Sequence, residues 1–148
     1  MKFGLTQESN LTTEQSSALN DLSLDISRFL EQKSYGKDVE ELYIGIICVK
    51  PEFEPFFKVR KPKYTKEFFS EKLGVPVSGK SILEIDLKID YNEVKDFDKN
   101  EITNYAASEI CQLFGNLNNL PKNIHDFEKN RFVDDIISFL SNKGSVLS

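Results

Sequence analysis

Apolar residues either alternate with polar ones or run without interruption in the segments that we expect to form β-strands. The run Leu42–Val49 is apolar on both faces and rich in β-branched residues, which is typical of a central strand, and Pro51 would end it. From Leu83 to Tyr91 every second residue is apolar and the intervening ones are charged, so this segment predicts a half-exposed strand. A weaker alternation over Met1–Thr6 predicts a short strand.

A fourth strand is expected over Phe56–Lys61, where side chains alternate up to Pro62. Because proline cannot donate a ladder hydrogen bond, we place this strand near an edge of the sheet. A turn from Pro51 to Pro55 would join it to Leu42–Val49 as a hairpin. The pattern leaves the structure of residues 64–81 open, since a short helix and a loop both fit its aromatic residues.

Three further segments repeat apolar residues at intervals of three and four, the spacing of one face of an α-helix. The first begins with a capping box formed by Thr12 and Gln15. The expected limits of the three helices are Thr12 to Ser34–Gly36, Asp98 or Asn100 to Gly115, and about Asn123 to Asn142–Gly144. Each helix has one apolar stripe, so each should cover another layer.

The resulting order is β-α-β-β-β-α-α, which indicates an α+β fold. Strands that follow one another directly should pair antiparallel, and the helices should cover mainly one face of the sheet. We therefore expect a two-layer sandwich with an antiparallel sheet of about four strands. At 148 residues the chain fits a single domain over residues 1–148.

Composition favours a folded protein of the cytoplasm, with 39% hydrophobic residues and no apolar run as long as a membrane span. Cys48 and Cys111 are far apart in the sequence and predict two buried, reduced thiols. His125 is the only histidine, so a metal site has little support. We expect no cofactor and no metal.

Charge is distributed unevenly along the chain, which has a net charge of −5. The stretch from Lys58 to Lys72 has six basic residues and two acids, whereas Glu84 to Glu101 has seven acids and three bases. Basic residues near Phe68 and Phe69 resemble a nucleic-acid surface, but the net charge opposes direct nucleic-acid binding. Pairing of Lys58 and Arg60 with Glu84 and Asp86 on the same exposed sheet face is the simpler explanation.

Gly74–Ser81 matches the phosphate-binding pattern G-x-x-x-x-G-K-[ST]. That loop binds phosphate only where a buried strand enters it and a helix leaves it with its positive end toward the anion. Here the segment that follows Ser81 has the strand pattern described above. We therefore interpret Gly74–Ser81 as a turn before a strand, and keep a P-loop nucleotide-binding protein as a minor alternative.

No group of residues predicts catalysis. His125 lies beside Asp126 near an expected helix start, where a capping or surface role is ordinary. The carboxylate pairs Glu84/Asp86 and Asp96/Asp98 fall on an exposed strand face and in a turn, and neither setting favours a buried acid of raised pKa. We expect no enzyme activity.

Element order and scattered segments resemble a family of small bacterial immunity proteins from polymorphic toxin systems. The segments that carry the resemblance are residues 1–8, Leu42–Val49, Phe57–Lys61 and Leu87–Tyr91 with the helix that follows. The stretch from Tyr64 to Ser81 departs from the family because it is longer than the usual connection.

The resemblance implies an inhibitor that binds a cognate toxin in the cytoplasm and blocks the toxin's active site. Toxins that degrade nucleic acid tend to have basic clefts, which an acidic surface would attract and occupy. The residues that we expect on this surface are Glu84, Asp86, Asp90, Glu93 and Asp96. An adaptor or regulatory domain without a toxin partner is the alternative, no membrane contact is expected, and the chain would be a monomer or a homodimer.

Overall fold

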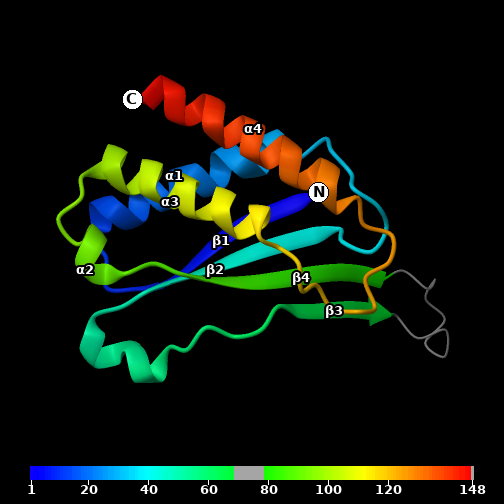
Figure 1. Cartoon of the computed structure of the whole chain (residues 1–148), viewed down its shortest axis with the longest axis horizontal. Coiled ribbons are helices and arrows are strands. Elements are labelled where there is room, and N and C mark those ends of the chain that lie inside the picture. Colours follow the sequence, from blue (N-terminus) through cyan, green and yellow to red (C-terminus); the bar gives the residue numbers. More distant parts are fainter. Residues whose placement is uncertain (69–78, 148) are drawn as a thin grey trace.

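The protein contains a four-stranded mixed sheet with helices on one face (Figure 1). The computed structural model describes residues 1–68 and 79–147. The strands are β1 (Lys2–Ser9), β2 (Glu41–Cys48), β3 (Lys63–Phe68) and β4 (Gly79–Lys88), in the spatial order β1-β2-β4-β3. β2 pairs in parallel with both β1 and β4, while β3 pairs antiparallel with β4.

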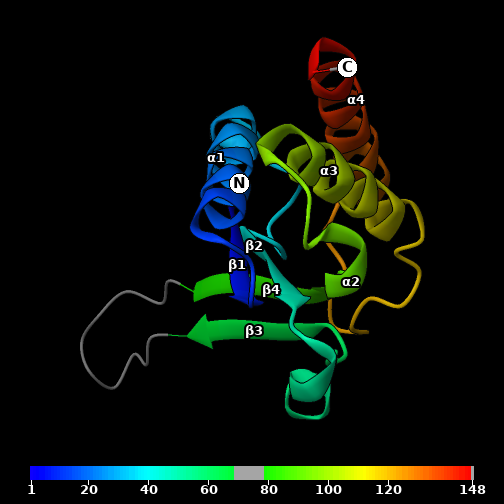
Figure 2. The ribbon, with the colours of Figure 1, turned by 90° about the vertical axis from the view of Figure 1, so that its left-hand side faces the viewer.

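The helices form the second layer, as Figure 2 shows from the side. The helices are α1 (Thr13–Leu30), the short α2 (Tyr91–Val94), α3 (Lys99–Gly115) and α4 (Lys129–Leu147), and the 3-10 helix η1 (Pro51–Phe56) lies apart from them. Capping boxes begin α1 at Thr12 and α3 at Asp98. In each case the side chain of the cap accepts the N–H of the third helical residue, and the side chain of that residue accepts the N–H of the cap.

The α+β class, the four strands and the helices on one face confirm the sequence prediction, but the antiparallel sheet is wrong. α1 carries the chain back between β1 and β2, so these strands run in the same direction. β2 then lies in the centre with a parallel neighbour on each side. Its uninterrupted apolar run reflects this position, which leaves little of the strand exposed.

The hairpin expected between Leu42–Val49 and Phe56–Lys61 is also wrong. Pro51 and Pro55 lie in η1, residues 57–62 form no strand, and β3 begins only after Pro62. β3 pairs with β4, and the neighbours of β2 in the sheet are β1 and β4. Of the open segment 64–81, the start and end belong to β3 and β4, and residues 69–78 lie outside the described residues.

The third predicted helix starts later than expected, at Lys129 rather than near Asn123. The preceding segment uses its backbone to contact the connection between α1 and β2: Asp126 accepts a bond from the Asp38 N–H, and the Glu128 N–H donates to Tyr35. These hydrogen bonds take the place of the backbone hydrogen bonds that a helix would form before Lys129.

The core lies between the sheet and the helices. Leu83, Ile85 and Leu87 of β4 are buried on the helix side, and α4 packs on α3 through Phe132, which is fully buried. The ring of Phe132 contacts Phe114 edge to face, with centroids 5.0 Å apart. Among the described residues, the opposite face of the sheet carries no helix longer than η1, and we call it the open face.

Candidate functional site

Acidic residues gather where β2 and β4 end. Because these strands are parallel, their carboxyl ends lie at the same edge of the sheet, and there the chain forms η1 after β2 and α2 after β4. A cleft of about 480 Å³ lies between the two, lined by Pro51 and Glu54 on one side and by Asp90, Asn92 and Tyr105 on the other, with Lys88 beside them. We call this surface the acidic end and define it by Glu52, Glu54, Asp90, Glu93 and Asp96.

Local hydrogen bonds fix the orientation of α2. Asp90 is its N-cap, and the carboxylate accepts the N–H of Asn92 at 3.0 Å. Glu93 accepts the hydroxyl of Tyr105 from α3 at 2.5 Å. This bond, together with burial, raises the pKa of Tyr105 above its ordinary value, so the hydroxyl stays a donor at neutral pH. α2 is thus held against α3 with its acids at the surface.

η1 is held at both ends. The Lys50 N–H, just before η1, donates to the side chain of Asn10 at 2.8 Å, and Glu54 lies 3.7 Å from the ammonium of Lys88. Pro51 and Pro55 restrict the backbone between these contacts. The acids of η1 are therefore presented on a short, stiff element rather than on a free loop.

Glu84 and Asp86 lie on the open face of β4, opposite its buried leucine and isoleucine side chains. Asp86 is not a free acid, because Arg60 binds it with its backbone N–H at 2.8 Å and its guanidinium at 2.9 and 3.1 Å. The sequence-based pairing of Arg60 with a strand acid is thus confirmed. Glu84 is exposed, and its neighbour across the ladder is Lys63 rather than Lys58.

The Arg60 contact controls the ionisation of Asp86. Burial alone would raise the pKa of this carboxyl, but the hydrogen bonds from the side chain and backbone of Arg60 hold it below its ordinary value. A lowered pKa in the folded state means that this contact stabilises the fold above the ordinary carboxyl pKa and is lost as the pH falls through the folded value. Asp86 therefore holds residues 57–62 against the sheet at neutral pH.

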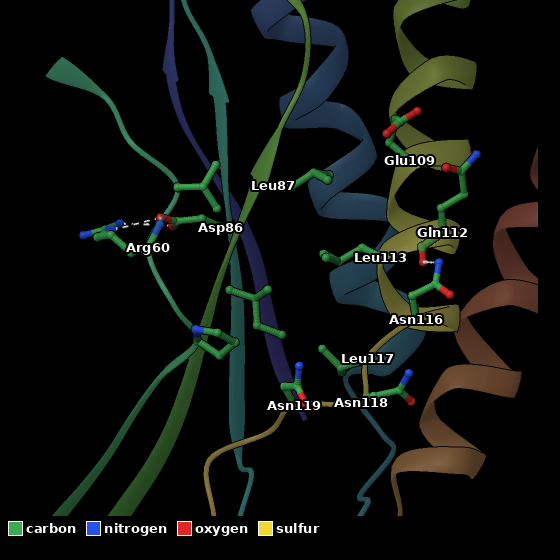
Figure 3. Close-up of a pocket in the computed structure, with 13 residues that line it drawn as sticks. Arg60, Asp86, Leu87, Glu109, Gln112, Leu113, Asn116, Leu117, Asn118 and Asn119 are labelled. Atoms are coloured by element: carbon green, nitrogen blue, oxygen red, sulfur yellow. Dashed lines mark hydrogen bonds and ion pairs between the residues drawn. The ribbon is translucent and has the colours of Figure 1, made fainter. Parts of the chain in front are cut away.

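A groove of about 420 Å³ separates the 59–62 segment and β4 from α3. In Figure 3 Leu87 of β4 and Leu113 of α3 point toward one another across it, while Glu109, Gln112 and Asn116 form a polar rim on α3. Of the charged residues in its lining, Arg60 and Asp86 bind each other and only Glu109 is left. The groove therefore provides a concave surface with side-chain amides, but its lining has no pair of groups suited to acid-base chemistry.

The structure divides the five predicted residues into two groups. Asp90, Glu93 and Asp96 belong to the acidic end, whereas Glu84 and Asp86 lie on the open face of the sheet. Glu52 and Glu54 are not among the residues predicted from the sequence, because Pro51–Pro55 was interpreted as a turn. Two prolines around alternating acidic and aromatic residues are the signal that points to an exposed, stiff element there.

The phosphate-loop match has no supporting geometry in the described residues. Gly74–Ser78 lies outside them, and Gly79 already begins β4, so a strand rather than a helix follows the loop. The hydroxyl of Ser81 is buried, donates to Lys37 and accepts the N–H of Glu40. Ser81 thus stabilises the adjacent connection instead of facing a ligand.

Asp38 is a buried acid that the sequence did not indicate. Its carboxylate accepts the N–H groups of Asp126 and His125, both at 2.8 Å, and lies 3.4 Å from the ammonium of Lys66. The hydrogen bonds from Asp126 and His125 lower the pKa of Asp38. Asp38 therefore joins three separate segments, which is a structural role. His125 itself is exposed and contributes only its backbone to this cluster.

Within residues 1–68 and 79–147, no three histidine, cysteine or acidic side chains are arranged to hold a metal ion. No helix in the same ranges has the length and apolar character needed to cross a bilayer. Both cysteines are free thiols, and Cys48 is buried while Cys111 is half-buried.

Comparison with known proteins identifies a family. The model of the family described as immunity protein 44 matches residues 1–142 of the chain. No curated protein and no solved structure matches it. The family match spans both the sheet and the helix layer, and it confirms the resemblance to immunity proteins that the sequence segments indicated.

Proposed function

The chain belongs to the immunity protein 44 family, and from this premise we propose that it binds a cognate protein toxin and neutralises it by covering the toxin's active site. The family match carries the proposal. The groove and the acidic end support it, because they offer contact surfaces for a partner. The protein would act in the cytoplasm of the cell that makes the toxin, as an inhibitor and not as an enzyme.

The acidic end is the surface that we propose for toxin binding, together with Glu84 on the open face of the sheet. In the acidic end five acids outnumber the neighbouring lysines Lys50, Lys88 and Lys95, and Glu54 already neutralises Lys88. Asp86 contributes indirectly, since its contact with Arg60 holds the adjoining segment in place. A surface of this sign accelerates association with a basic partner.

A toxin that cleaves nucleic acid is the partner that this charge fits best. Its cleft must attract phosphates with lysine and arginine side chains, and carboxylates of an inhibitor can occupy the same positions. The chain's own net charge of −5 repels nucleic acid, so the inhibitor would compete with the substrate rather than bind it.

Growth of a host that expresses the toxin tests the proposal. Expression of this chain should restore growth, and the double variant Glu52→Lys/Asp96→Lys should need higher expression because its association with the toxin is slower. The control is Glu31→Lys/Asp134→Lys, which changes the net charge equally at exposed residues outside the acidic end. Equal rescue by both double variants would contradict the proposed surface, and no rescue by the unmodified chain would contradict the function.

A further inference from the structure

Exposed aromatic and aliphatic side chains are concentrated in the connection between β2 and β3. Four large apolar residues of the described chain are solvent-exposed, and three of them lie here: Phe53 is 42% exposed, Phe56 79% and Val59 49%. Leu24 on α1 is the fourth, at 52%. Single exposed apolar residues are ordinary, but a cluster on one short segment indicates a contact surface.

The geometry of η1 places two of these rings on one side. A 3-10 helix has three residues per turn, so side chains three positions apart lie one above the other. Phe53 and Phe56 have this spacing within Pro51–Phe56. They form a ridge on η1, which lies beyond the sheet on the side opposite α1, α3 and α4 (Figure 2), and both rings are exposed. We call Phe53 and Phe56 the aromatic ridge.

The backbone that carries the ridge is restrained before any partner arrives. Pro51 and Pro55 fix two backbone angles, and the N–H groups of Phe53 and Phe57 bond to Lys50 and Glu54 at 2.9 and 3.1 Å. The contacts of Lys50 with Asn10 and of Arg60 with Asp86 fix the segment on either side. A ring carried on a restrained backbone loses less conformational entropy on binding than one on a free loop, which favours it as an energetic anchor in a protein interface.

We propose that the aromatic ridge inserts into an apolar pocket with a basic rim on the cognate toxin, an inference that rests on the proposed function. The acids Glu52 and Glu54 flank Phe53, and η1 carries no basic residue. Because Glu54 lies 3.7 Å from the ammonium of Lys88, Glu52 is the acid that carries the charge argument. A pocket that receives the rings therefore meets negative charge at its edge and needs positive charge there. The ridge is also continuous with the cleft that joins η1 to Asp90, so both would contact one partner.

A second copy of this chain fits the ridge less well. A two-fold symmetric contact through η1 would bring the Glu52 and Glu54 of one copy against those of the other. Like charges at the edge of an apolar contact oppose association. The toxin is therefore the occupant to which we assign the ridge.

The test measures affinity for a catalytically inactive form of the toxin that the chain neutralises. Phe56→Ala should weaken binding by at least roughly 30-fold, the loss typical of an interface anchor, and Phe53→Ala should weaken it to a smaller extent. Leu24→Ala is the matched control, since it removes a similarly exposed apolar side chain from the helix layer. It should leave the affinity within about threefold. Melting temperatures of all three variants should stay close to that of the unmodified chain because these side chains are exposed.

The outcomes separate this inference from the proposed function. If the unmodified chain neutralises the toxin and Phe56→Ala binds as tightly as Leu24→Ala, the ridge is not the anchor but the function holds. If sedimentation shows a dimer that Phe56→Ala dissociates while toxin affinity is unchanged, the ridge is a self-association surface and our assignment is overturned. If the unmodified chain neither binds nor neutralises the toxin, the proposed function fails and the ridge has no toxin to enter.

Discussion

Gln15 joins the first turn of α1 to the connection between α2 and α3 through its side-chain amide. The amide nitrogen donates to the carbonyl oxygens of Val94 at 2.8 Å and Phe97 at 3.0 Å, and reaches Lys95 at 3.3 Å. The amide oxygen accepts the N–H of Thr12. Gln15 is only 3% exposed, so these carbonyls have little access to water as a substitute.

Gln15→Glu retains the bond to Thr12 but replaces the two donors with a carboxylate that faces carbonyl oxygens. A buried hydrogen-bond partner left unsatisfied costs roughly 1–3 kcal/mol, so two short bonds lost together should lower the free energy of unfolding by about 3 kcal/mol at pH 7. For a small domain that unfolds with a slope of about 2 kcal/mol per molar urea, the midpoint should fall by about 1.5 M.

The pH dependence gives the sign of the effect. Burial and the facing carbonyls should raise the folded-state pKa of the introduced carboxyl above the unfolded value of about 4.3. The loss in free energy of unfolding caused by Gln15→Glu is then largest at pH values above the folded-state pKa of the introduced carboxyl. It should shrink as the pH falls toward about 4, because the protonated carboxyl regains one donor.

Urea titrations followed by circular dichroism at pH 7 and pH 4.5 measure this difference. Glu101→Gln is the matched control, because Glu101 is the corresponding capping-box residue of α3 but is exposed and bonds only to the N–H of Asp98. It should change the free energy of unfolding by less than about 0.5 kcal/mol. An unchanged midpoint for Gln15→Glu at pH 7 would refute the assignment of these carbonyls to the Gln15 amide.

Three other properties can be predicted from the structure. Burial raises the pKa of the Cys48 thiol to about 12 and raises that of Cys111 as well, so at pH 8 dithionitrobenzoate should modify Cys111 slowly and Cys48 only after denaturation; rapid labelling of both would contradict this. Phe132→Ala should lower the free energy of unfolding by about 3–5 kcal/mol in a denaturant titration, and a loss below about 1 kcal/mol would mean that the ring is not enclosed. Arg60→Ala should speed tryptic cleavage after Lys58, as mass spectrometry of the fragments can show, whereas an unchanged rate would mean that the contact with Asp86 does not hold the segment.

Local patterns in the sequence predicted local structure well. The period of two from Leu83 to Tyr91 identified β4, and the capping box of Thr12 and Gln15 identified the start of α1. Strand direction was wrong, although a signal was present, since an uninterrupted apolar run such as Leu42–Val49 is typical of a parallel sheet. The late start of α4 depends on backbone bonds between Asp38 and Asp126, and no local pattern reports such a distant contact.

The candidate surface was predictable only as a stretch of acids. Sequence spacing places Glu84 and Asp86 on one strand face, but it cannot show that Arg60 already binds Asp86. Nor can it show that η1 lies beside Asp90, because that cleft forms only when β2 and β4 run parallel. The toxin-binding role of Glu84, Asp86, Asp90, Glu93 and Asp96 stays a prediction.

Titration of the toxin's activity with the purified chain tests the central claim most directly. The toxin is to be identified by tagging the chain in its native host and isolating the protein that accompanies it in stoichiometric amounts. If the chain is its inhibitor, activity should fall linearly and vanish at one chain per toxin, and the complex should elute as one species in size exclusion. Full activity in the presence of excess chain, with or without a stable complex, would contradict neutralisation and would favour an adaptor that binds without inhibiting.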